Sequence, residues 1–207
     1  GEWIHSHALH IYMLHAPDFL GTPDIIAVAR DHRAAVERGL ALKKAGNRLQ
    51  EVIGGRAIHP VNVRLGGFYS VPTRADLMPM AQELRQALDH ALATVAWVAG
   101  FDFPDLTVDH EFLALTGERY ALEGGTVARS AGPAFPIAQF SDHVRETHVA
   151  HSTALHATLD GRPHLTGPMA RFSLNHDRLS PLAKEAAAAA GLGTECRNPF
   201  RSIVVRA

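Results

Sequence analysis

Apolar residues recur at helical spacing in several stretches of the chain. In the first stretch this spacing predicts a helix over residues 2–16. Pro17 is expected to end it, because proline lacks the N–H that an inner helical turn uses. A second helix is predicted to begin with Thr22 as N-cap and Pro23 in the first position. Gly46 is expected to end this second helix in a left-handed conformation.

The longest predicted helix covers residues 73–99. Its apolar residues step by three or four positions and predict one buried stripe. The stripe comprises Leu77, Ala81, Leu84, Leu88, Leu92, Val95 and Ala99. A last helix is predicted to begin at the N-cap Ser180 with Pro181 in first position, and to end at Gly191.

Between these helices the pattern changes to short apolar stretches separated by Gly-rich turns, which favours strands. The stretches are residues 112–115, 126–130, 155–159 and 164–172. The pair Asp160-Gly161 is typical of a tight hairpin turn. We therefore expect a helix-rich α+β fold, with long helices packed around a small, mostly antiparallel sheet.

The pattern contains no repeat and no linker, so we expect residues 1–207 to belong to one domain. Its parts are predicted to be helical over 1–104, sheet-containing over 105–178 and helical again over 179–207. Both ends look cut, because the chain begins with glycine and stops inside an apolar segment. We expect it to be a fragment of a longer protein.

Composition excludes several classes of protein. Apolar residues make up 46% and charged residues 20%, and the formal net charge is −1 with no basic cluster, so no nucleic-acid or membrane partner is expected. No apolar run is long enough for a membrane span. The single cysteine, Cys196, excludes an internal disulfide and any Cys-x-x-Cys metal site built by this chain alone. A reducing, cytoplasmic location is expected.

The fourteen histidines invite a metal-site hypothesis. His7 and His10, and also His148 and His151, are three residues apart, which on a helix places both rings on one face. Neither pair has the glutamate of an H-E-x-x-H motif, so a zinc hydrolase is a weak alternative. No serine elbow and no glycine-rich phosphate loop is present either.

Three ordered stretches carry a family resemblance. Residues 6–20 end in LHAPDFL, which Gly21 follows. Residues 54–67 carry two glycine pairs around His59-Pro60 within GGRAIHPVNVRLGG, and residues 197–203 include RNPF. Together they resemble the large subunits of [NiFe]-hydrogenases, most closely the cytoplasmic, cofactor-coupled type. The resemblance covers essentially the whole chain.

This resemblance implies a parent enzyme that oxidises H2 reversibly, with H2 and protons as substrates and with one partner, an iron–sulfur small subunit. In the family, four cysteines in two Cys-x-x-Cys motifs hold nickel and iron, and this chain has neither motif. We therefore expect the nickel–iron centre to belong to the parent enzyme, and this chain alone to bind no cofactor and to be an inactive scaffold.

Two residues match family positions near the metals. Asp18 matches an aspartate in the canopy over the centre, and His59 matches the histidine of the glycine-pair segment, which lies near a cysteine ligand. The resemblance implies that both tune the metal site without binding the metal. The structural alternatives are that Asp18 caps a turn after Pro17 and that His59 is a packed core residue.

A stand-alone hydrogenase-like module that serves in binding or assembly, without a metal site, is the alternative to the hydrogenase fragment. Under the fragment hypothesis, surfaces that face absent parts of the parent are exposed as apolar patches. We therefore expect the isolated chain to self-associate.

Overall fold

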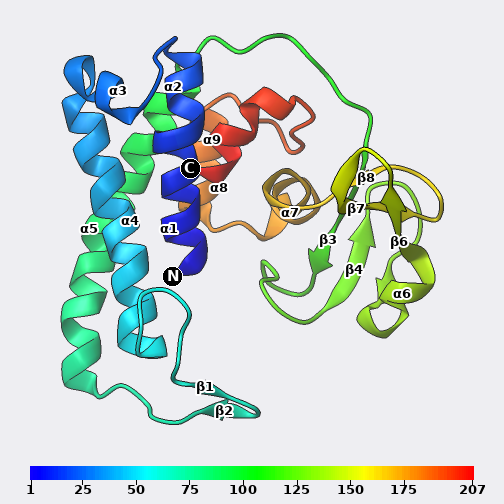
Figure 1. Ribbon diagram of the computed structural model, residues 1–207, viewed down its shortest axis with the longest axis horizontal. Helices are drawn as coiled ribbons and strands as arrows, with labels where there is room; N and C mark the ends of the chain where they lie inside the picture. Colours follow the sequence, from blue (N-terminus) through cyan, green and yellow to red (C-terminus); the bar gives the residue numbers. More distant parts are fainter. The chain divides into compact units, whose positions relative to one another are not determined.

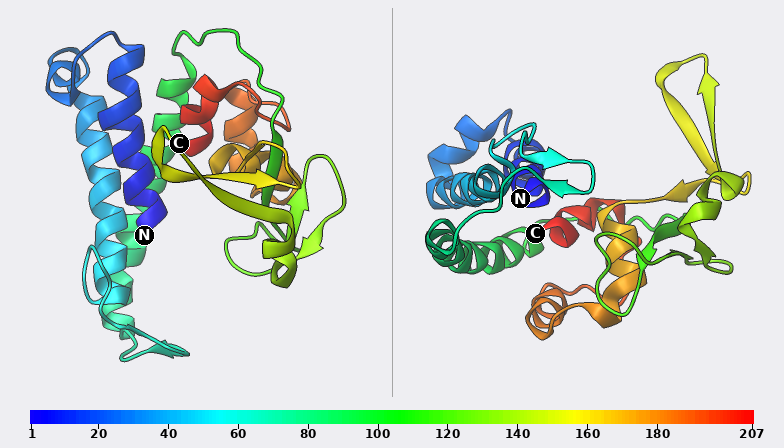
Figure 2. Two further views of the ribbon diagram at one scale, coloured as in Figure 1. Left: turned by 45° about the vertical axis from the view of Figure 1, so that its right-hand side comes forward. Right: turned by 90° about the horizontal axis from the view of Figure 1, so that it is seen from below.

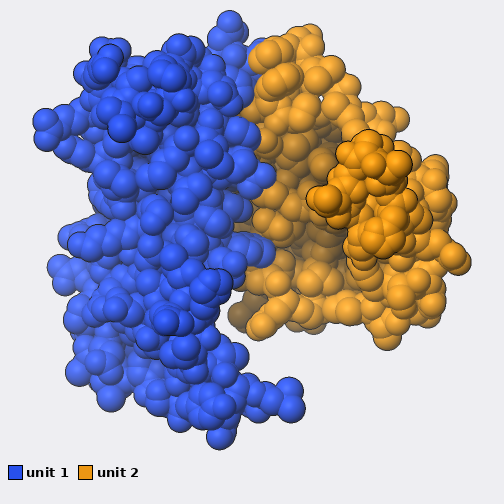
Figure 3. All heavy atoms as spheres, viewed as in Figure 1, with its two compact units in different colours: residues 1–103, 206–207 blue, residues 104–205 orange.

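The chain divides into two units in the computed structural model, which describes all 207 residues. Unit 1 comprises residues 1–103 and 206–207, and unit 2 comprises residues 104–205 (Figure 3). Unit 1 is helical apart from one short hairpin, whereas unit 2 combines strands and helices. The predicted helix-rich α+β fold with small, mostly antiparallel sheets is confirmed. No helix is both long enough and apolar enough to cross a membrane.

Unit 1 is built around helices α1, α4 and α5, which lie side by side in Figure 1, with α4 in contact with both others. In chain order its elements are α1 (Glu2–Leu9), a π-turn (His10–His15), α2 (Ala16–Phe19), α3 (Ile25–Asp31), α4 (Arg33–Gly54), β1 (Val63–Arg64), β2 (Gly67–Phe68) and α5 (Arg74–Ala99).

The first helix does not end at Pro17, so that prediction is wrong. The helical path continues through the π-turn into α2, which ends at Phe19. The N–H of Ala16 donates to the carbonyl of Ile11, five residues back, so the turn just before the proline is wider than an α-turn. A widened turn gives the proline ring room beside the preceding carbonyls, and this explains why the helix tolerates it.

The second predicted helix is two helices with a different beginning. Asp24, rather than Thr22, is the N-cap, since its Oδ1 accepts a 2.9 Å hydrogen bond from the N–H of Ala27. The path breaks at His32, where φ is −126° and ψ is 40°, and α4 begins directly afterwards. The Thr22 hydroxyl instead donates to the carbonyl of Pro17.

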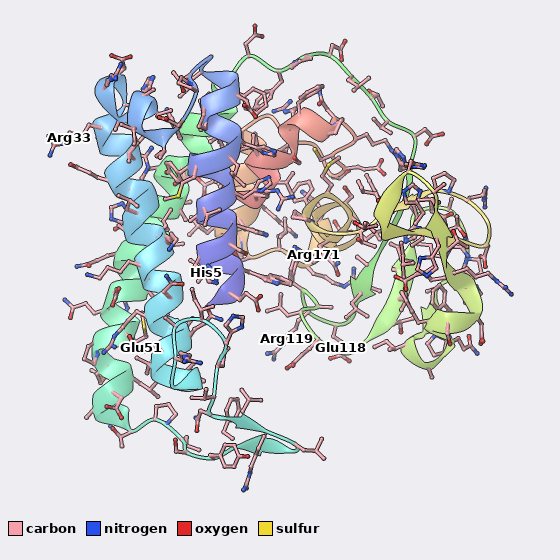
Figure 4. The ribbon with its side chains drawn as sticks, viewed as in Figure 1. His5, Arg33, Glu51, Glu118, Arg119 and Arg171 are labelled. Carbon is pink, nitrogen blue, oxygen red and sulfur yellow. The ribbon has the colours of Figure 1, made fainter.

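Gly46 lies inside α4 and not at its end, so this prediction is also wrong. A Cβ atom at Gly46 would lie 2.6 Å from the backbone nitrogen of His5, which is near the beginning of α1 (Figure 4). The glycine therefore serves the close packing of α1 on α4. The left-handed end of the helix is Gly55, with φ 77°.

Helix α5 has the predicted extent, and Thr73 is its N-cap. Thr73 and Asp76 form a capping box: Asp76 N–H donates to Thr73 Oγ1, and Thr73 N–H donates to Asp76 Oδ2 at 2.9 Å. Both hydrogen bonds join residues only three positions apart. The predicted extent of the helix, residues 73–99, is confirmed.

The predicted buried stripe of α5 is displaced. The buried residues are Met80, Ala87, Thr94 and Val98. Leu77 and Leu88 of the predicted stripe are 40% and 47% exposed. The apolar pattern marks every apolar position of α5 and does not show which of them neighbouring elements cover. Within unit 1, neighbouring helices cover only a narrow face of α5. The leucine face is therefore only partly covered, with Leu84 and Leu92 half-buried.

Unit 2 contains a four-stranded sheet with the order β5-β4-β3-β8 and a separate hairpin, β6-β7. Figure 2 shows that hairpin (yellow-green) standing away from the four-stranded sheet. The elements are β3 (Glu111–Thr116), β4 (Thr126–Arg129), β5 (Phe135–Pro136), a 3₁₀ turn (Ile137–Gln139), α6 (Phe140–His143), β6 (Val144–Val149), β7 (Ser152–Leu159), β8 (His164–Leu165), α7 (Pro168–Asn175), a 3₁₀ turn (His176–Arg178), α8 (Pro181–Ala189), a 3₁₀ turn (Pro199–Arg201) and α9 (Ser202–Arg206), whose last residue groups with unit 1.

The alternation of side chains along β3 gives unit 2 two small cores. Phe112 packs with Met169 and Phe172 of α7, whereas Leu113 packs with Val127 and Leu159. Neighbouring residues of a strand point to opposite faces, so one strand serves both cores. β3 pairs antiparallel with β4 and parallel with β8.

The strand predictions for unit 2 are partly wrong. The stretch 164–172 forms only the two-residue β8, because Gly167 (φ 89°) turns the chain and Pro168 begins α7. Strands β5 and β6 are absent from the prediction, since their sequences lack long apolar runs. The Asp160-Gly161 turn is confirmed, with φ angles of 48° and 79°. The cap at Ser180 and the left-handed Gly191 (φ 68°) around α8 are also confirmed.

Candidate functional site

Asp18 and His59, the two residues that the resemblance selects, both lie on the surface of unit 1. Asp18 is in α2, and its carboxylate acts on His15, whose pKa it raises against a larger lowering by burial. No hydrogen bond or ion pair joins Asp18 to His59. Both side chains are therefore open to groups outside residues 1–207, and their roles near a metal centre stay predictions.

His59 stands in a strained loop. Its φ of 54° is in the left-handed region, which residues other than glycine rarely adopt. The loop folds back onto the end of α4, where the N–H groups of Val61 and Asn62 both donate to the carbonyl of Gly54 at 2.9 Å. A Cβ atom at Gly54 would lie 2.8 Å from Pro60. The close approach explains the first glycine pair of the segment.

Asn62 holds this loop closed, and the sequence alone did not point to it. Its Nδ2 donates to the carbonyls of Ile53 and Ser70 at 2.8 and 2.7 Å. Its Oδ1 accepts from both the N–H and the hydroxyl of Ser70 at 2.9 Å. One amide thus joins the end of α4 to the strand that leaves the β1-β2 hairpin, and fixes where His59 is presented.

A buried hydroxyl cluster lies behind the first helix. The hydroxyl of Tyr12 is 2.6 Å from Thr94 Oγ1 of α5 and accepts a 2.9 Å hydrogen bond from Arg38 Nε of α4. The Tyr12 ring stacks on Trp97, with ring centroids 5.3 Å apart. These contacts fix the helical segment that carries Asp18 to both long helices.

The same segment brings together two histidines that spacing did not pair. His10 Nε2 lies 3.1 Å from His15 Nε2, and the two rings meet edge to face. Burial is the largest cause that lowers the pKa of His10 to about 4, and nearby Arg206, His15 and His7 lower it further. The pKa of His15 is lowered too, by burial and then Arg206. Both rings are therefore neutral at pH 7.

The histidine pairs chosen by spacing do not form a metal site. His148 is in β6 and His151 is in the turn before β7, so the helical spacing assumed for them is wrong. The rings that meet there are His151 and His156, with centroids 5.2 Å apart. The structure has no group of three or more His, Cys, Asp or Glu side chains arranged to hold a metal ion. The zinc-hydrolase alternative has no support.

The chain's own residues do not fit a nickel–iron centre held by thiolates. Cys196 is buried in unit 2, where its backbone N–H donates to Ser173 Oγ and its thiol donates to the carbonyl of Asn198. Burial raises the pKa of this thiol, so it is not a ready metal ligand. Any such centre needs ligands from outside residues 1–207.

Unit 2 contains a buried ion network. Arg129 donates to Glu111 Oε1 and to Asp160 Oδ2, each at 2.6 Å, and its side chain is 5% exposed. Asp160 also pairs with His143 at 3.0 Å, and these contacts lower the pKa of the Asp160 carboxyl. The network ties β3 and β4 to the turn after β7 and to α6, and so it serves the fold.

Comparison with known proteins points to one group of enzymes. No family model matches the chain. The alpha subunit of sulfhydrogenase 1 from Pyrococcus furiosus is 32% identical over 210 residues, which cover all of this chain and 49% of that protein. The alpha subunit of sulfhydrogenase 2 from the same organism is 32% identical over 183 residues, 86% of this chain and 41% of the relative. A subunit of the F420-non-reducing hydrogenase vhu from Methanococcus voltae is 28% identical over 220 residues, 90% of this chain and 50% of the relative.

Among solved structures, a chain of an NAD⁺-reducing [NiFe]-hydrogenase in its H2-reduced state superposes with a TM-score of 0.80. The match covers 99% of this chain and 53% of the other, at 20% sequence identity, and it shows the fold. The chain thus spans about half the length of the relatives that it matches.

Proposed function

We propose that this chain, which belongs to the large-subunit family of [NiFe]-hydrogenases as a segment of about half its relatives' length, is the central scaffold of an enzyme that oxidises H2 reversibly. The observation that carries the proposal is the 32% identity to a hydrogenase alpha subunit over the whole chain. Identity at this level along an entire sequence supports a common function better than a match confined to one motif.

The metal chemistry of this proposal depends on residues outside the chain. Nickel and iron would activate H2, and thiolates would supply the soft ligands that nickel prefers. Residues 1–207 contribute one buried cysteine, so the ligands come from other parts of the complete protein. The chain alone would bind no nickel and would be inactive.

Asp18 and His59 are proposed to tune that centre from this chain. Both side chains are exposed and free of hydrogen bonds within the chain, as expected of groups that act on partners from elsewhere. The strained backbone at His59, with φ 54°, supports the same role, because such strain is concentrated at functional sites. The Asn62 clamp would hold the His59 loop in place.

A partner subunit is also proposed. The relatives are named as subunits of larger enzymes, and we propose that the electron acceptor of this one is an iron–sulfur small subunit. The β1-β2 hairpin and its flanks expose a set of apolar side chains that we call the hairpin surface: Ile58, Val61, Val63, Leu65, Phe68, Tyr69 and Val71. Such an exposed patch is typical of an interface. A cytoplasmic location is proposed from the type of hydrogenase that the sequence resembles.

The experiment is hydrogen uptake by the complete protein with an artificial electron acceptor. Asp18→Asn is expected to lower turnover about tenfold or more, since it removes a charge near the reacting centre. Asp31→Asn is the matched control, because Asp31 is an exposed carboxylate at the end of α3, and it is expected to leave turnover unchanged. Equal turnover in both variants would refute the role of Asp18, and a complete protein without hydrogen uptake would refute the proposed function.

A further inference from the structure

His10 and His15 meet only because the helix widens between them. On a regular α-helix, residues five apart point about 140° away from each other. The backbone bond from Ala16 N–H to Ile11 carbonyl, five residues back, opens the turn and brings the two rings to one side. Single π-turns of this kind are frequently found at functional sites. The contact is therefore built into the backbone and is not a chance meeting of mobile side chains.

The two rings share a hydrogen bond. The Nε2 atoms are 3.1 Å apart, so one carries a proton and the other a lone pair. The ring centroids are 4.1 Å apart with planes 72° to each other. Two imidazoles bound to one zinc ion at about 2.0–2.1 Å would hold their centroids about 5 Å apart. The geometry thus suits proton sharing and not a shared metal ion.

The Nδ1 atoms, which take no part in the contact between the two rings, have different surroundings in His10 and His15. His15 Nδ1 is shielded from solvent and has no hydrogen-bond partner in the protein, whereas His10 is only partly buried and keeps contact with solvent. A buried N–H without an acceptor is rarer than an unfilled acceptor. We therefore assign the proton to His15 Nε2, which donates to His10 Nε2, and a lone pair to His15 Nδ1.

We propose that His10 and His15 form a proton relay between solvent and the buried Nδ1 of His15. This inference rests on the proposed function, because hydrogen oxidation releases protons that must leave the protein interior. A proton that binds His15 Nδ1 lets His15 Nε2 pass its proton to His10 Nε2, and His10 Nδ1 releases one to solvent. One proton enters, one leaves, and both rings end neutral in the opposite tautomers. Proton exchange with water while the pair is open restores the first tautomers.

The charges around the pair suit this role. Arg206 lowers the pKa of both rings, His7 lowers that of His10, and Asp18 raises that of His15. With a pKa of about 4, His10 is protonated in about one molecule in a thousand at pH 7. The rings conduct a proton without trapping it.

The first test uses the complete hydrogenase with His10→Gln and His15→Gln, because a glutamine cannot accept a proton on one side while releasing one on the other. Each variant is expected to lower kcat for hydrogen oxidation at least about tenfold, with an unchanged KM for H2 and a larger solvent deuterium isotope effect. His5→Gln, the same substitution earlier on the helix path, is the control and is expected to keep wild-type kcat. Wild-type kcat in both pair variants would overturn the relay.

The second test does not depend on activity. Exchange of the imidazole C2 hydrogen with deuterium, followed by mass spectrometry, gives the pKa of each histidine. A lowered His10 pKa that rises in His15→Gln, while burial and Arg206 still hold it below 6.5, supports a closed pair. A His10 pKa near 6.5 in the unaltered protein would overturn the relay even if hydrogen turnover is normal. A closed pair in a protein without hydrogen turnover would overturn the proposed function, and with it the relay's task.

Discussion

At the scale of single residues, Tyr12 joins three helices through one hydroxyl. The hydroxyl bonds to Thr94 of α5 and accepts from Arg38 of α4, while its ring lies against Gly39. Tyr12 and Thr94 are each 1% exposed, while Arg38 reaches them from a partly buried position. A buried polar network of this kind stabilises one arrangement of its partners, because each unpaired group would be costly.

Gly39→Ala tests this packing. A Cβ atom at position 39 would lie 2.4 Å from Tyr12 Cγ, and the ring cannot move without breaking its hydrogen bonds. Overpacking costs about 1–3 kcal/mol, which exceeds the roughly 0.5–1 kcal/mol that alanine gains over glycine in a helix. The free energy of unfolding, measured by denaturant titration, is therefore expected to fall. Gly100→Ala, whose nearest neighbour would lie at 3.5 Å, is the control, and equal stabilities of the two variants would contradict the account.

His10 makes stability depend on pH. Its pKa is about 4 in the folded chain against 6.5 for the free group, so between these values the unfolded chain binds more protons. The free energy of unfolding is therefore expected to fall as pH drops from 6.5 to 4, and to be insensitive to His10 above 6.5. Unfolding curves across this range should be flatter for His10→Gln than for the unaltered protein. Parallel curves would show that burial of this ring has no such effect.

At the scale of elements, the sequence predicts what local chemistry decides. The cap at Ser180 and the Asp160-Gly161 turn depend on neighbours within four residues, and both are confirmed. The predicted ends at Pro17 and Gly46 are wrong, because a π-turn and the approach of α1 decide them. Predictions made from neighbouring residues alone include neither the π-turn nor the packing of α1 on α4.

In the candidate site, too, some residues can be predicted from the sequence and others only from the structure. Asp18 and His59 are selected because they lie in segments that resemble the hydrogenase large-subunit family, and their roles stay predictions. Asn62 could not be found because its four hydrogen bonds reach residues eight or nine positions away. The contact of His10 with His15 could not be found either, since five is not a helical spacing and only the π-turn brings the rings together. A π-turn has no recognised sequence signal.

The ion network of unit 2 gives a prediction at this scale. Arg129→Ala is expected to destabilise the protein by about 3 kcal/mol, because it leaves the buried Glu111 carboxylate, 7% exposed, with only the more distant Arg162 at 4.0 Å. Arg33→Ala is the matched control: Arg33 pairs with Glu37 on the outer side of α4 (Figure 4), and that side chain is 83% exposed. Denaturant titration should show little change in the control. A similar loss in both variants would indicate that the network is no stronger than a surface pair.

At the scale of the whole molecule, the hairpin surface is the clearest candidate for an interface. Leu65 at its tip is fully exposed, and Figure 3 shows this part of unit 1 projecting from its lower end. Three arginines and no acidic residue occur between positions 52 and 75. An apolar surface with a basic rim is expected to bind an apolar, acidic surface in the complete enzyme.

The isolated chain is therefore expected to self-associate. Light scattering at rising concentration should show a mass above that of one 22.4 kDa chain. Leu65→Asp should reduce this association, whereas Leu122→Asp, which changes an exposed leucine of unit 2, should not. A strictly monomeric chain at high concentration would contradict the prediction.

The central claim is that the chain is the scaffold of a hydrogenase whose metal ligands lie elsewhere. Nickel content and hydrogen uptake, measured side by side on the complete protein and on residues 1–207, test it most directly. The complete protein is predicted to hold about one nickel per molecule and to consume H2, while residues 1–207 do neither, because their one cysteine is buried. Stoichiometric nickel with turnover in residues 1–207, or a complete protein without either, would contradict it.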